Sequence, residues 1–153
     1  MITEDYVSFE TAELLKENGF DEEVFGYYHI WDRKINRPVW SIGTYIRSEA
    51  PHLYIKAPTI QIARKWIREK YNILFIVDYE YECDTTPYYF KIYRLGEYGK
   101  PERVAIKGVS YDKDNNATEH IIGYCNWERS KGDYSTYEEA CESALKYCLE
   151  NLI

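Results

Sequence analysis

The segment of residues 72–82, NILFIVDYEYE, constrains the fold of this chain more than any other. It begins as a continuous apolar run and becomes a strict alternation, with Val77 and Tyr79 on one face. The acidic residues Asp78 and Glu80 fall on the other face, because successive side chains of a strand point to opposite sides. Such a strand lies inside a sheet at its start and has one face in solvent at its end. The segment therefore predicts an antiparallel sheet with a covered face and an open face.

Other segments continue this pattern and are separated by polar turns. Strands are predicted at residues 23–31, 39–46, 52–56, 87–95, 103–112 and 120–127. Apolar residues at helical spacing predict helices at about 9–18, 58–71 and 136–152. Ser8 is the expected N-cap of the first helix, and Gly19 fits the left-handed position beyond its end. Pro58 is expected at the first position of the second helix. Ser135 and Glu138 have the spacing of a capping box in the third.

These elements predict a single α+β domain over residues 1–153, with an antiparallel sheet of about five to seven strands and helices packed on one face. A chain of about 150 residues buries roughly 68–70% of its unfolded surface, so this core needs no metal or disulfide. Tyr89 and Tyr93 are expected on the sheet face away from the helices. The predicted core consists of Trp66, Ile67, Phe75, Val77, Phe90, Ile92, Leu145 and Cys148.

The second predicted helix is basic in an acidic chain. Residues 56–70 hold five basic residues and one acidic residue, whereas the whole chain has a formal net charge of −7. On a helical wheel one half is apolar, and Arg64, Lys65 and Arg68 lie on the other half, which is expected to face outward. These three side chains are candidates for binding the phosphates of a nucleic acid or nucleotide. The same face could instead be solvated, or pair with an acidic surface of this chain or of a second copy.

Tyrosine is unusually frequent, with 17 residues, most of them in predicted strands. A tyrosine ring packs well on a half-buried sheet, and tyrosine is also enriched at protein interfaces. Both interpretations stay open, and Tyr89 and Tyr93 are the interface candidates. The balance of 19 basic and 26 acidic residues argues against a protein that coats nucleic acid without specificity.

Three acidic residues of one strand face, Asp78, Glu80 and Glu82, are spaced about 6.6 Å apart. This spacing is compatible with a carboxylate pair for sugar hydrolysis or with a hard metal ion. On the solvent side of a strand, however, such residues usually pair with a neighbouring Lys or Arg. The segment 112–123 begins like a calcium loop but lacks the glycine and the final glutamate of an EF-hand. No nucleophile-elbow, phosphate-loop or dinucleotide motif occurs, so no catalytic residue, metal site or cofactor is predicted.

The first ten residues, MITEDYVSFE, lack the features of a signal peptide, and the longest aliphatic run is ILFIV. A membrane span needs about 18 apolar residues, so we expect a soluble cytoplasmic protein without membrane contact. Its four cysteines are expected to be free, because thiols stay reduced in that compartment and no C-x-x-C pair occurs.

Three segments carry a resemblance: AELLKENGFDEEVFGYY at 12–28, APTIQIARKWIREKYNI at 57–73 and YSTYEEACESALKYCLENLI at 134–153. They resemble an uncharacterised family of small proteins from gut Bacteroidota and their phages. That family has a leading helix that ends in Gly-Phe-Asp-Glu, a middle helix with a Lys/Arg-Trp core, and a C-terminal helix that starts Tyr-x-Thr-Tyr-Glu-Glu-Ala. The resemblance covers about a third of the chain. It implies an accessory protein of phage or mobile-element origin and carries no activity with it.

We therefore expect a non-enzymatic interaction protein that self-associates through its tyrosine-rich sheet surface, as a homo-oligomer or with another protein partner. One alternative is a nucleic-acid or nucleotide binder that uses the basic face of residues 61–68 and stacks bases on exposed tyrosines. The other is a hydrolase that uses the carboxylates of Asp78 or Glu80. The lack of a catalytic motif favours the interaction protein over the hydrolase.

Overall fold

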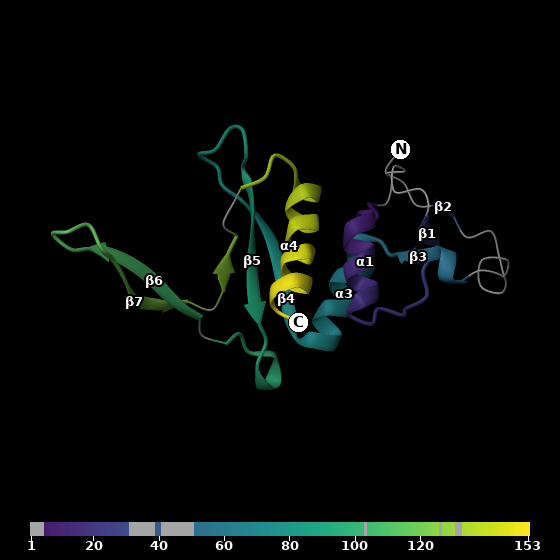
Figure 1. Cartoon of the computed structure of the whole chain (residues 1–153), viewed down its shortest axis with the longest axis horizontal. Helices are drawn as coiled ribbons and strands as arrows, with labels where there is room; N and C mark the ends of the chain where they lie inside the picture. Colours follow the sequence, from purple (N-terminus) through teal and green to yellow (C-terminus); the bar gives the residue numbers. More distant parts are fainter. Residues whose placement is uncertain (1–4, 31–38, 41–50, 103, 126, 131–132) are drawn as a thin grey trace.

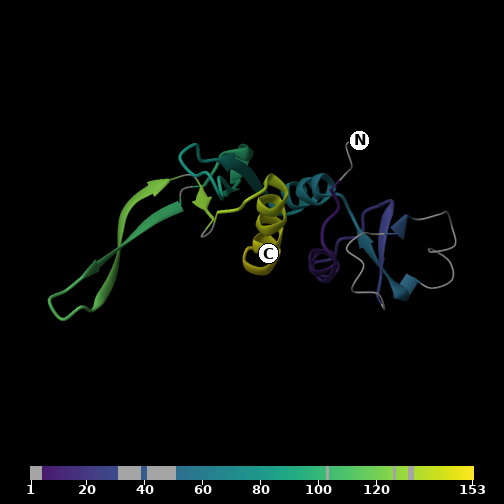
Figure 2. The same cartoon turned by 90° about the horizontal axis from the view of Figure 1, so that it is seen from above.

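The computed structural model describes residues 5–30, 39–40, 51–102, 104–125, 127–130 and 133–153. Within these residues the protein is α+β, and its strands pair antiparallel in small sheets with the orders β2-β1-β3, β4-β5-β8 and β6-β7. The α+β class is confirmed, but the predicted single sheet of five to seven strands is wrong. The first two sheets lie on either side of the helices, and β6-β7 projects at one end (Figures 1 and 2).

The first sheet is built around β1, with β2 and β3 on its two sides. The elements of this region are β1 (Gly26–His29), β2 (Val39–Trp40), the 3-10 helix η1 (Pro51–Leu53) and β3 (Tyr54–Ala57). The strands predicted at 23–31 and 52–56 are confirmed within shorter or shifted bounds. Most of the strand predicted at 39–46 lies outside the described residues. Because α3 follows β3 directly, the chain leaves this sheet before the next strand begins.

The second sheet has β5 at its centre. Its strands are β4 (Ile73–Tyr79), β5 (Tyr88–Arg94) and the short β8 (Glu128–Arg129), and the 3-10 helix η2 (Glu97–Gly99) follows β5. β4 and β5 pair over their whole lengths. β4 ends before Glu82, contrary to the prediction, because the Cys83 N–H donates to the Glu80 carbonyl at 3.3 Å and the chain turns toward β5. The alternation of apolar and acidic residues in the sequence therefore extends past the end of β4 into the turn.

The helices are α1 (Phe9–Glu17), α3 (Ile60–Tyr71) and α4 (Tyr137–Asn151). The ends of α1 are confirmed: the Thr11 N–H donates to Ser8 Oγ at 3.2 Å, and Gly19 has a φ of +82°. The N–H groups of Gly19 and Phe20 donate to carbonyls of the last turn, which is a Schellman motif. This reversal places the Phe20 ring edge-on to Trp66, with centroids 5.3 Å apart. The cap thus joins α1 to α3.

The N-terminus of α3 differs from the prediction by two residues. Thr59 is the N-cap, since its hydroxyl accepts the N–H of Ile62 at 3.3 Å, and Pro58 precedes the cap instead of opening the helix. At the other end, Asn72 has a left-handed φ of +56°, and its N–H donates to the Arg68 carbonyl at 3.1 Å. Asn is one of the few residues that adopts this conformation readily, so the chain turns at once into β4.

The capping box of α4 is also displaced, by one residue. It joins Thr136 and Glu139 and does not involve Ser135 with Glu138. The Glu139 N–H donates to Thr136 Oγ1 at 3.1 Å, and the Thr136 N–H donates to the Glu139 carboxylate at 3.3 Å. The same carboxylate accepts the Ser135 N–H at 3.2 Å, so Glu139 satisfies donors outside the helix that Glu138 does not.

One continuous core joins the helices to the first two sheets. α4 packs on β4 and β5, α3 packs against β4 and α4, and α1 packs against α4 and β3. The predicted core is confirmed except for Val77, which is only half-buried. The confirmed members are Trp66, Ile67, Phe75, Phe90, Ile92, Leu145 and Cys148.

The third sheet is a two-stranded ribbon of β6 (Val104–Tyr111) and β7 (Ala117–Cys125), and it projects away from the core (Figures 1 and 2). Its register shifts between Ile106 and Lys107, which marks a β-bulge. Beyond the bulge, every residue from 109 to 121 is exposed. The strand predicted at 103–112 is confirmed at 104–111, and the one predicted at 120–127 begins earlier, at Ala117.

Candidate interaction surfaces

The helical wheel predicted that Arg64 faces solvent on the basic side of α3. The structure contradicts this prediction. The Arg64 side chain is half-buried and reaches across to β4, where Nη2 donates to the Phe75 carbonyl at 3.0 Å. Its guanidinium lies 4.9 Å from the centroid of the Phe75 ring, and Nη1 donates to the Tyr137 hydroxyl at 3.5 Å. Phe75 belongs to an edge strand, so Arg64 caps a carbonyl that has no neighbouring strand to pair with.

Lys65 and Arg68 stay on the outer face of α3, as predicted. Both side chains are exposed, and both lie 3.9 Å from the carboxylate of Glu69. Such exposed pairs contribute little to stability. Of the three phosphate-binding candidates, the structure therefore keeps two together and uses the third to join α3 to the second sheet.

The open face of the β4-β5-β8 sheet forms a network of charged side chains. Lys91 Nζ lies 2.6 Å from the carboxylate of Asp78, and Arg129 Nη2 lies 2.6 Å from that of Glu80. Asp133 also contacts Arg129, at 3.1 Å. Asp78 and Glu80 thus pair with cross-strand basic residues, which confirms the structural interpretation of these acids. The Lys91 hydrogen bond is the main cause of a lowered pKa at Asp78, whereas a general acid needs a raised one.

The interface candidates Tyr89 and Tyr93 are both half-buried on β5. The Tyr89 ring supports the network: the Arg129 guanidinium lies 3.7 Å from its centroid, and its hydroxyl donates to Asp78 at 3.3 Å. Lys91 lies over the neighbouring Trp127 ring at 4.8 Å. These cation–π contacts use the ring faces that an interface would need. Tyr89 therefore belongs to the charged network with Asp78 on the open face of the sheet. It is not among the contacts of Arg64, which are Phe75 and Tyr137.

The described cysteines form no disulfide. Cys83, Cys141 and Cys148 are free thiols, as predicted for them. Burial raises the pKa of Cys148 to about 12, so this thiol packs in the core and does not ionise. Among the described residues, no group of three His, Cys, Asp or Glu side chains is placed to hold a metal ion. In the same part of the chain, no helix has the length and apolar character to span a membrane.

Beyond the bulge, the ribbon carries its exposed apolar residues on one face. In the register of β6 and β7, Val109 is opposite Glu119 and Tyr111 is opposite Ala117. The alternation of strands then places Val109, Tyr111 and Ile121 on the same side, and their exposed fractions are 51%, 66% and 57%. We call the side with these three residues the apolar face of the ribbon.

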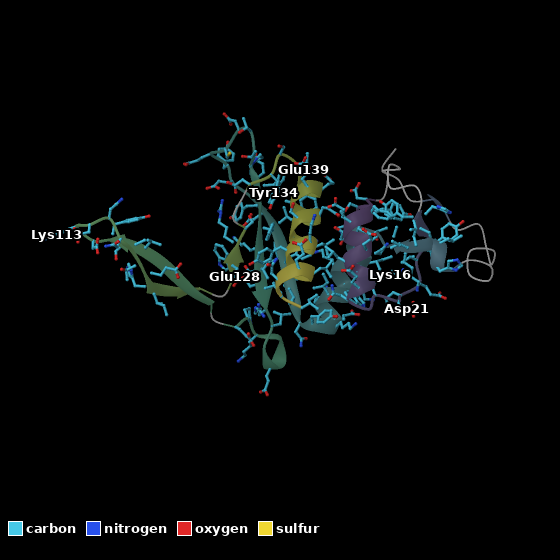
Figure 3. The ribbon with its side chains drawn as sticks, in the orientation of Figure 1. Lys16, Asp21, Lys113, Glu128, Tyr134 and Glu139 are labelled. Carbon is cyan, nitrogen blue, oxygen red and sulfur yellow. The ribbon has the colours of Figure 1, made fainter. Side chains whose placement is uncertain are left out.

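Beyond the bulge, the opposite side of the ribbon is small and polar. Ser110 pairs with Thr118, and Gly108 pairs with His120, so these residues alternate with those of the apolar face. Side chains stand out from both sides of the ribbon, and Lys113 marks its far tip (Figure 3). The ribbon is therefore amphipathic, yet the face that would normally be covered is exposed.

The tip of the ribbon is held by local hydrogen bonds. Asp112 accepts the N–H groups of Asp114 and Asn116, both at 2.9 Å, and Asn116 Nδ2 donates to it at 3.0 Å. These bonds lower the pKa of Asp112. Asn115 has a left-handed φ of +64°. The segment that begins like a calcium loop is thus a β-turn in which Asp112 holds backbone donors.

Sequence reasoning did not single out the apolar face, although its signal was present. Val109 and Tyr111 alternate with Gly108 and Ser110 in the strand predicted at 103–112. The alternation predicts a covered face but does not say which other element covers it. Comparisons with protein-family models, curated proteins and solved structures found no match for this chain.

Proposed function

We propose that this protein is a non-enzymatic interaction protein that self-associates, and that its contact element is the β6-β7 ribbon. The observation that carries the proposal is the exposure of Val109, Tyr111 and Ile121 together on one face of a projecting element. A contiguous exposed apolar patch with polar surroundings is typical of an interaction site, whereas scattered apolar residues are not.

The stability of the ribbon supports the same proposal. A two-stranded hairpin is marginally stable in water at best, and three strands or a packed face are needed for independent stability. Residues 109–121 are all exposed in the folded chain. A partner on the apolar face would supply the missing burial, so ordering the ribbon and binding a partner would support each other.

The tyrosines of β5 are less well placed for the contact than Tyr111. Tyr89 already holds Arg129 and Asp78, while Tyr111 is exposed on the apolar face. The proposal therefore moves the expected interface from Tyr89 and Tyr93 to the ribbon. Nucleic-acid binding through α3 has less support, because Arg64 is engaged with the second sheet. An accessory role in a phage or mobile element, implied by the resemblance, is the context we propose for this activity.

The test uses the full chain at concentrations from low micromolar to submillimolar. Sedimentation velocity measures the mass, and hydrogen exchange at the two ends of the range locates the contact. We expect a concentration-dependent rise in mass and slower exchange of amides in residues 104–125. A monomer over the whole range overturns the proposal. An oligomer that protects β5 and leaves the ribbon unchanged overturns the assignment of the ribbon.

A further inference from the structure

We propose that the partner of the apolar face is the same face of a second copy, in a closed twofold dimer. This inference rests on the proposed function and adds the geometry of the contact and the stoichiometry. Val109, Tyr111 and Ile121 of one copy would pack on the same three residues of the other, and Ser110, Thr118 and His120 would remain in solvent. A contact of one face with itself is isologous, so it closes at two copies and does not grow into a filament.

The distribution of charge favours a second copy at the ribbon over one at the body. Residues 104–125 hold two lysines and three acidic residues, so the ribbon carries −1 and the rest of the chain carries −6 of the total of −7. Two bodies therefore repel each other. The ribbon holds the contact away from them, because eight residues of strand span about 27 Å at roughly 3.4 Å per residue. This distance exceeds the Debye length of about 8 Å at physiological ionic strength.

The same charge count argues against the other classes of occupant. A β-ribbon that enters a nucleic-acid groove needs basic side chains to neutralise phosphates, and this ribbon has a formal charge of −1. A strongly charged protein partner would need a charge of the opposite sign on the ribbon, but Lys107 and Lys113 are balanced by acids in the same segment. A nearly neutral apolar face fits a copy of itself, because neither copy brings a large net charge to the contact.

The size of the face sets the strength of the dimer. The face runs from Ala117 to Ile121 along β7, about 17 Å, and is two strands, or about 10 Å, wide, so it offers roughly 170 Å² per copy. A standard stable interface uses about 800 Å² per partner. We therefore expect a transient dimer with a dissociation constant in the micromolar range or above, whose extent depends on protein concentration.

Glu119 lies on the apolar face opposite Val109 and opposes the dimer. In a twofold contact, two copies of this carboxylate approach the same axis, and burying or crowding like charges is unfavourable. Glu119→Gln should therefore tighten the dimer. Asp84→Asn is the matched control, because Asp84 is exposed in the turn between β4 and β5 and its substitution removes the same charge from the body.

Adjacent residues on opposite faces give the decisive comparison. Val109→Asp and Ser110→Asp add the same charge to neighbouring exposed positions of β6, and only Val109 lies on the apolar face. Each substitution is present twice in a dimer, so we expect Val109→Asp to raise the dissociation constant about tenfold or more, and Ser110→Asp to change it less than about threefold. Val109→Thr keeps the branched shape and strand propensity, and it should weaken the dimer without altering the circular dichroism spectrum.

Sedimentation equilibrium of the full-length variants measures these constants at low and high salt. We expect wild-type dimerisation to change little between physiological and high salt, because the ribbon holds the acidic bodies farther apart than the Debye length. Weakening by Ser110→Asp with no effect of Val109→Asp and Val109→Thr overturns the inference but leaves self-association through the ribbon intact. Equal effects of Glu119→Gln and Asp84→Asn, or association that continues beyond two copies, also count against the face-to-face dimer. The absence of any self-association overturns both proposals.

Discussion

Replacing Arg64 with methionine tests whether the basic helix belongs to the fold or to a binding surface. Methionine keeps an apolar stem of similar length, so the packing of this α3 side chain against β4 is largely preserved. What it removes is the guanidinium, which donates to the Phe75 carbonyl at 3.0 Å and lies over the Phe75 ring. If Arg64 were instead a binding residue on a solvated face, its replacement would change the free energy of unfolding of the protein very little.

The expected loss follows from the two contacts. A hydrogen bond from a charged group contributes about 1.5–3 kcal/mol. A cation–π contact at a partly exposed site adds about 0.5–1 kcal/mol. Against these gains stands the loss of conformational entropy when the half-buried Arg64 side chain is ordered, which is about 2 kcal/mol at most. We therefore expect Arg64→Met to reduce the free energy of unfolding by about 2 kcal/mol, which includes leaving the Phe75 carbonyl without its donor.

Urea denaturation followed by circular dichroism measures the change, and Lys65→Met is the matched control on the neighbouring position. Lys65 is 65% exposed and lies 3.9 Å from Glu69, so its substitution should change stability by less than about 0.5 kcal/mol. For Arg64→Met the urea midpoint should fall by about 1 M at an unchanged m-value. If the two variants differ by less than about 0.5 kcal/mol, Arg64 does not join α3 to β4 and the reasoning is refuted.

Two further predictions concern α4 and the open face of the second sheet. Thr136→Ala should lower the free energy of unfolding by about 1 kcal/mol, because it removes the acceptor of the Glu139 N–H. Ser135→Ala should have almost no effect. Equal losses in urea titrations of the two variants would contradict the observed capping box. The pKa of Asp78 is lowered, first by the Lys91 hydrogen bond, so its stabilisation is present above the unfolded pKa and is lost as the pH falls through the folded one. Asp78→Asn should therefore lower the free energy of unfolding by less than about 1 kcal/mol at neutral pH, since the carboxyl is 44% exposed. It should also flatten the decline in thermal stability as the solution becomes acidic. An unchanged decline would contradict the ion pair of Asp78 with Lys91.

Local structure was predictable wherever neighbouring residues decide it. Ser8 and Gly19 bound α1 as expected, because a hydroxyl N-cap and a glycine after the helix act within one turn. The displaced caps of α3 and α4 show the limit of this reasoning. Ser135 and Thr136 are both suitable N-caps with a glutamate three residues on, so the spacing alone does not choose between them.

The arrangement of strands was not predictable from alternation. A strand pattern states that one face is covered, but it does not identify the partner on either edge. The chain places α3 between β3 and β4 and packs the helices between two sheets, so strands that looked alike in sequence belong to separate sheets. Arg64 was misplaced for the same reason: a helical wheel assigns a face, whereas a long side chain can reach around the helix to an edge carbonyl.

The contrast between the body and the ribbon carries the functional argument. In the body, charged side chains such as Arg64, Lys91 and Arg129 contact groups of the same chain, and the apolar faces meet in one core. In the ribbon, the apolar face contributes area that folding alone does not bury. Ordering residues 109–121 opposes folding by roughly 10 kcal/mol or more of backbone entropy, which is offset by strand pairing and by the hydrogen bonds of Asp112 in the turn. A second copy that covers the face would stabilise the ribbon and form the dimer in one step, which explains why an amphipathic ribbon would be kept on a protein whose core is already complete.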